Sequence, residues 1–274
     1  MDETIKSSSS SDFDSKEQAK ERISELSRTA VERLHRVLQN ESEDPTSLLE
    51  TARSLTSALN KDSIMADTVS LDDGIFLIDG FQRLAFQDAD NGGLLDIADW
   101  CMAQWLGILQ RHPENVAALQ GLGQNWLSRA QSSLALIHRD EGSSSSGASV
   151  GKIGPCGMTY SRSDEEREVR RASVQANEDR HSPPYVEARG VLRPSTEFFQ
   201  QAVRAAQTQG LLSGQLLISA AEAHMSLGNV SYSDASEDYF RQALEYLQQA
   251  SEIPNYSLPS YLQQYLEDFG RLVE

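Results

Sequence analysis

The stretch from Pro113 to Trp126 constrains the fold of this chain more than any other. Its apolar residues recur every three or four positions, which places them on one face of an α-helix. The residues of this stripe are Val116, Leu119, Leu122 and Trp126. Gly123 lies beside the stripe and costs a helix about 1 kcal/mol relative to alanine, which is tolerable where a neighbouring helix must come close. We therefore predict a helix after Pro113 that buries Leu122 and Trp126 against a second helix.

These residues resemble the first helix of a tetratricopeptide (TPR) repeat, which reads W-x-x-L-G-x-x-Y and follows the proline that closes the previous repeat. Leu119 stands at the Trp position, and Leu122 with Gly123 at the Leu-Gly pair. Trp126 takes the place of the Tyr. The preceding helix supplies the small, aromatic and small residues expected before the proline at Cys101, Trp105 and Ile108.

A second segment, residues 217–254, resembles the same repeat. The positions of Trp, Leu-Gly and Tyr are taken by Leu217, Ala220-Ala221 and His224, with Gly228 ending the first helix. The small, aromatic and small positions of its partner helix are Ala243, Leu247 and Ala250. Between the two helices the chain is longer than the repeat allows, so we predict a surface loop over 229–237.

Strand signals are nearly missing, which predicts an all-α fold. The resemblance implies a TPR-like α-solenoid of antiparallel helical hairpins, about ten helices in all. The predicted order is a disordered tail over 1–14, an N-terminal helical array with one TPR-like unit over 15–139, a flexible Ser/Gly-rich linker over 140–163, and a C-terminal TPR-like array with a capping helix over 164–274.

Net charge limits the class of partner, and cysteine content limits the cellular compartment. The formal net charge of -17 argues against nucleic acid or an anionic membrane surface and favours a basic or neutral protein partner. Cys101 and Cys156 are too few for a disulfide framework. The N-terminus lacks a signal-peptide pattern, and no apolar run could span a bilayer. We therefore expect a cytoplasmic, possibly nuclear, protein without a membrane segment.

No constellation of residues predicts an active site, a metal site or a cofactor. The five histidines are far apart, and none shares a helix face with another ligand at metal-binding spacing. The stretch 147–152 is too short between its glycines for a phosphate-binding loop and lacks Ser or Thr after Lys152. Ser173, which follows Arg170-Arg171-Ala, matches the pattern of basophilic kinases and is a possible phosphorylation site.

The TPR resemblance implies a concave working surface lined by the first helix of each repeat. Transferring its positions gives the predicted partner-binding residues Gln120, Gln124, Leu127, Ser128, Gln215, Ile218, Glu222 and Met225. The Lys, Asn and Arg set that clamps the carboxylate of Hsp70 or Hsp90 tails is not there, because Gln120 and Gln124 occupy two of its places. The surface is instead suited to a peptide or helix held by amide hydrogen bonds and apolar pockets.

These features predict a non-enzymatic scaffold or adaptor. The alternatives are a regulatory or assembly subunit of an enzyme complex, or a small helical enzyme whose site is not visible in the sequence. A cluster of perturbed titratable groups in a concave pocket would favour an enzyme, whereas a polar, elongated groove would favour the adaptor.

Overall fold

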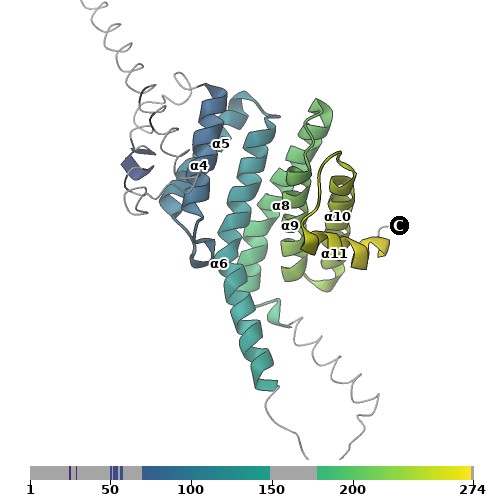
Figure 1. Ribbon diagram of the computed structural model, residues 1–274. Helices are drawn as coiled ribbons and strands as arrows, with labels where there is room; N and C mark the ends of the chain where they lie inside the picture. The colour runs from purple at the N-terminus through teal and green to yellow at the C-terminus, as the bar shows by residue number, and fades with distance from the viewer. Residues whose placement is uncertain are drawn as a thin grey trace, which may run out of the picture. The chain divides into compact units, whose positions relative to one another are not determined.

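The computed structural model describes residues 70–148 and 178–272, with a few isolated positions before them, and is helical throughout its regular elements (Figure 1). No strand occurs in these ranges, so the predicted all-α class is confirmed for the described part of the chain. The elements are α4 Leu71–Ala85, η1 Ala89–Asn91, α5 Leu95–Arg111, α6 Val116–Ala148, α8 Pro183–Gln209, α9 Gly214–Val230, α10 Ser233–Glu252, α11 Ser260–Phe269 and η2 Gly270–Leu272. The predicted tail over 1–14 lies outside the described residues.

The chain divides into two compact units. One comprises residues 1–87 and 94–107, and the other comprises 88–93 and 108–274. This division differs from the predicted one, because α6 and α8 belong to the same unit although they flank the predicted linker. Helix α6 also continues through 140–148, where the sequence predicts the start of that linker. The rest of the predicted linker, 149–163, is outside the described residues.

In the first unit, α4 and α5 share an aromatic and polar core. The rings of Phe81 and Trp100 meet edge to face at 5.5 Å between centroids, the geometry that aromatic quadrupoles favour. The buried Trp105 indole donates from Nε1 to Gln82 Oε1 at 3.1 Å. Cys101 is fully buried, and its thiol donates to the Ile78 carbonyl at 3.6 Å.

In the second unit, α6 and α8 approach each other closely at Gly123. A Cβ at this position would lie 2.9 Å from the ring of Phe199, so a larger residue would force the helices apart. Ser195 Oγ donates to the Gly123 carbonyl at 2.8 Å. At the other end of the pair, Tyr185 Oη donates to Glu141 Oε1 at 2.6 Å, which makes the two helices antiparallel. The predicted close approach of a second helix at Gly123 is confirmed.

Helix α9 packs on α8 in the same antiparallel manner. His224 Nε2 lies 3.1 Å from Gln200 Nε2, and its Nδ1 lies 2.8 Å from the Ala220 carbonyl. The ring is therefore a neutral tautomer that donates from Nδ1 and accepts at Nε2. At the opposite end, the buried Arg189 guanidinium donates to the Val230 carbonyl at 2.6 Å and so satisfies the C-terminus of α9.

Helix α10 completes the series by packing against α9 (Figure 1). The Phe240 ring lies over Gly228, whose added Cβ would be 3.0 Å from the ring, and Tyr246 meets His224 edge to face at 5.4 Å. The hydrophobic core of this unit therefore runs through α6, α8, α9 and α10 in chain order.

The prediction for the apolar stripe of α6 is right for Leu122 and wrong for Trp126. Leu122 is fully buried, whereas Trp126 is only half-buried, with the Arg129 guanidinium 6.0 Å from its ring centre. The core position next to it belongs to Leu127. Because consecutive residues of a helix are turned by about 100° from each other, Trp126 falls at the edge of the buried face.

Candidate interaction site

A groove of about 630 Å³ lies between the C-terminal halves of α6 and α9. Helix η1 contributes one residue to its wall. The lining residues are Asp90, Gln131, Leu134, Ala135, Ile137, His138, Glu141, Ser226, Asn229 and Val230. Their spacing on α6 and α9 is helical, so each helix presents one continuous face to the groove.

The groove combines apolar and polar groups. Ile137 and Val230 are buried and provide apolar surface, while Gln131 and Asn229 offer amide groups. A mixture of apolar contact surface and a few convergent polar groups is the usual chemistry of a binding site. The groove can therefore hold a partner's side chains by both burial and hydrogen bonding.

Two carboxylates give the groove its electrostatic character. Asp90 and Glu141 line it together with His138, whose Nδ1 is 3.9 Å from Glu141 Oε2. Burial, followed by the hydrogen bond to Glu141, raises the pKa of the Tyr185 hydroxyl to about 12. This protonated hydroxyl fixes the Glu141 carboxylate in place. None of the described residues that line the groove is Lys or Arg, so it attracts cationic groups.

Three of the predicted partner-binding residues lie on the faces that lead into this groove. Gln124 and Ser128, linked by a 3.2 Å hydrogen bond, precede the groove residues Gln131 and Ala135 at helical spacing. Glu222 stands one turn before Ser226 on α9 in the same way. The groove residues of α6 were missed because the TPR motif ends at Trp126, and Asn229 and Val230 were missed because they follow Gly228. Continuing the two polar stripes along their helices would have found Gln131 and Asn229.

Two of the other predicted partner-binding residues are buried and not available to a partner in this structure. Leu127 is 6% exposed and Ile218 is 3% exposed, and both belong to the hydrophobic core. Met225 is half-buried and packs against the same core, and Gln120 is half-buried on α6. The faces of α6 and α9 are turned so that these apolar positions meet neighbouring helices. The possible phosphorylation site Ser173 is outside the described residues.

The remaining predicted residues on α9 contact the chain's own C-terminal region. Tyr261 Oη donates to Glu222 Oε1 at 2.5 Å, and Tyr256 Oη donates to Gln215 Oε1 at 3.4 Å. The hydrogen bond to Glu222, followed by burial, raises the pKa of Tyr261 to about 12. Gln215 and Glu222 are thus occupied by two tyrosines of the same chain.

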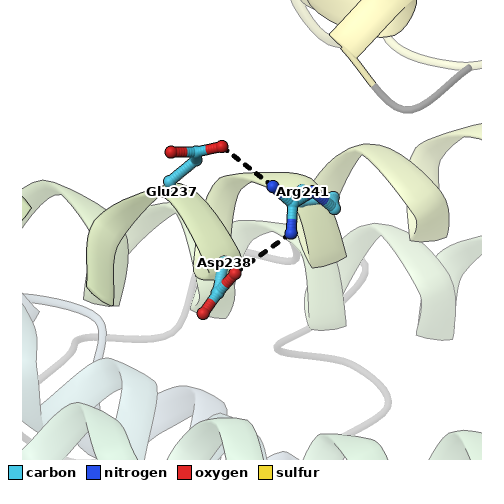
Figure 2. A network of polar contacts seen from close by, with 3 residues as sticks. All are labelled: Glu237, Asp238 and Arg241. Carbon is cyan, nitrogen blue, oxygen red and sulfur yellow. Dashed lines mark hydrogen bonds and ion pairs between the residues drawn. The ribbon is translucent and has the colours of Figure 1, made fainter. Parts of the chain in front are cut away.

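A second group of charges lies on the exposed surface of α10 (Figure 2). Arg241 pairs with Glu237 at 2.8 Å and with Asp238 at 3.1 Å, at the helical spacings expected for intrahelical ion pairs. Exposed pairs of this kind stabilise a helix by about 0.3 to 0.5 kcal/mol each. They are a solvated surface and not a site.

Within the described residues, no group of three or more His, Cys, Asp and Glu side chains is placed to hold a metal ion. No helix in the described part of the chain is long and apolar enough to cross a bilayer.

Comparison with protein-family models, curated proteins and solved structures finds no match to this chain. The TPR resemblance therefore remains an interpretation of the sequence.

Proposed function

We propose that this protein is a non-enzymatic adaptor that binds a basic peptide or helix of a partner protein in the groove between α6 and α9. The groove itself carries the proposal, because it is about 630 Å³ in volume and its described lining includes the carboxylates of Asp90 and Glu141 but no Lys or Arg. A Lys or Arg side chain of the partner would meet these carboxylates, while its aliphatic stem would contact Ile137 and Val230.

The order of helices supports a TPR-like reading of this region. In that reading α6 and α8 form one hairpin and α9 and α10 the next, and both TPR-like sequence segments fall on these helices. The first helices of the hairpins, α6 and α9, would then line the binding surface, where the groove lies. A cytoplasmic or nuclear location would suit such an adaptor.

A peptide-display library screened against the full chain tests this proposal. We expect enrichment of peptides with Lys or Arg, and about tenfold weaker binding of these peptides to Glu141→Gln, since one close charge interaction is lost. Raising the salt concentration should weaken wild-type binding.

A steric variant provides the second arm of this test. Ala135→Arg fills the groove and should abolish binding of the selected peptides, whereas Gln201→Arg places the same charge on an exposed position of α8 as a control. Selection of acidic peptides, or normal binding to Ala135→Arg, would refute the groove as the binding surface.

A further inference from the structure

The chain's C-terminal segment, defined as residues 253–269, meets α9 through Tyr256, which bonds to Gln215, and Tyr261, which bonds to Glu222, while its helix α11 packs against α10. Asn255 has a φ of 61°, a left-handed conformation that Asn tolerates, and it turns the chain back after α10. The ring of Tyr256 then covers Gly214, where any added Cβ would overlap the ring. Glycine is therefore required at 214 for this contact.

The hydrogen bond of Tyr261 to α9 lies one helical turn before the groove begins. Tyr261 bonds to Glu222, and Ser226, four residues further on, lines the groove. One helical turn advances about 5.4 Å along the axis, so a peptide that extended from the groove along this face would meet Tyr261. The segment and a longer partner therefore compete for one continuous surface of α9.

The C-terminal segment is held by one fully buried residue and by several apolar side chains that stay partly exposed. Leu262 is the one buried residue of α11, and the partly buried side chains that pack against the core are Ile253, Tyr256, Leu258, Tyr265 and Leu266. Tyr261 is 59% exposed and Phe269 is 46% exposed. Regions with few buried apolar contacts open at a lower free energy than the global unfolding of the protein. The segment can thus detach while α9 and α10 remain folded.

We propose that the C-terminal segment is an intramolecular competitor that occupies the α9 face through Tyr256 and Tyr261, and that an extended, tyrosine-bearing partner segment displaces it. This inference rests on the proposed binding function of the neighbouring groove. The partner would place an aromatic ring on Gly214 and a hydroxyl on Glu222, as the chain's own segment does. Access to the face would then depend on how readily the segment detaches.

A labelled copy of the segment is the probe that tests this proposal. A fluorescein-labelled peptide of residues 253–269 is titrated with the full chain, and fluorescence polarisation measures its binding. A tethered segment has an effective concentration on the order of millimolar, so the wild-type chain should bind the peptide weakly. The full chain carrying Tyr256→Ser and Tyr261→Ser should bind it about tenfold or more tightly, because its own segment no longer holds the face.

Two glycine variants of that double mutant test whether the peptide binds the α9 face around Gly214. Adding Gly214→Ala should remove the gain, since the new Cβ occupies the place of the Tyr256 ring. Adding Gly190→Ala, where an added Cβ has no neighbour within 4 Å, should leave the gain intact. Circular dichroism checks that all variants remain folded. Equal peptide affinity for wild type and double mutant, or equal effects of the two glycine variants, would overturn the proposal.

The peptides enriched in the display screen distinguish failure of this inference from failure of the proposed function. If Ala135→Arg abolishes their binding while the labelled segment behaves identically on all variants, the groove stands and the competition does not. If Ala135→Arg leaves their binding unchanged while the double mutant gains affinity for the segment, the groove fails and the α9 face still binds its own segment.

Discussion

Two contacts within the second unit are built in opposite ways. One joins α6 to α8, and the other joins the C-terminal segment to α9. At the helix pair, Gly123 and Phe199 are fitted so closely that an added methyl group would lie 2.9 Å from the ring. In the C-terminal segment, Leu262 is the one fully buried residue of α11, and the hydroxyls of Tyr256 and Tyr261 bond to α9. The first contact is suited to maintaining the fold, and the second to opening.

The two faces of α9 take part in these two kinds of contact. The side that meets α8 carries the buried His224, which is paired with Gln200. The side that meets the C-terminal segment carries Glu222, a half-buried carboxylate that holds an exposed tyrosine. One helix thus has a permanent contact and an exchangeable one.

Phe199→Ala should have the largest effect and would test whether the helix pair is the stable part. Phe199 is fully buried, and truncation of a buried Phe costs about 3 to 5 kcal/mol. We expect a large loss in the free energy of unfolding, measured by chemical denaturation. Phe269→Ala, at a half-exposed residue of α11, is the control and should change that free energy little. A small loss in Phe199→Ala would mean that the α6 and α8 contact is not the main support of the unit.

Leu262→Ala tests whether the C-terminal segment opens independently of the α6 and α8 pair. Burial of a leucine stabilises by about 1.5 to 3 kcal/mol, and here that stabilisation belongs to the C-terminal segment. Amide hydrogen exchange should therefore rise by about tenfold or more in residues 256–266 while α6 and α8 remain protected. A uniform rise across α8, α9 and α10 would show instead that the segment unfolds together with the rest of the unit.

Acidification should lower the free energy of unfolding through His224, which lies where α9 meets α8, by a smaller amount than Phe199→Ala does. Burial lowers the pKa of His224 below its ordinary value of 6.5, and its ring faces Gln200, Tyr239 and Tyr246. Below pH 6.5 the unfolded chain takes up a proton at this position before the folded chain does. The free energy of unfolding should thus fall as the pH is lowered from 6.5 towards the folded-state pKa, by at most about 1.4 kcal/mol per pH unit.

A comparison of variants isolates this effect. His224→Gln removes the titrating ring, so the pH dependence of its unfolding should be flatter over the same range. His112→Gln, at an exposed position, should keep the wild-type dependence. An identical pH dependence in wild type and His224→Gln would show that protonation of this ring does not affect stability.

Much of the fold could be predicted from local patterns, and the site only in part. The close approach at Gly123 was predictable because a glycine inside an amphipathic helix suggests a neighbour. The roles of Leu127 and Ile218 were not, because which helix face is covered depends on how neighbouring helices cross. The placement of Tyr256 on Gly214 requires a tertiary contact between residues that no periodic pattern links.

The close contact between α6 and α8 has a consequence for how this protein can diverge. Positions 123 and 199 share one fixed volume, since the Phe199 ring fills the space that a side chain at 123 would need. A lineage that gains alanine at 123 must replace Phe199 by a smaller residue before that change or together with it. These two positions, 76 residues apart in the chain, should therefore change together among descendants of this sequence.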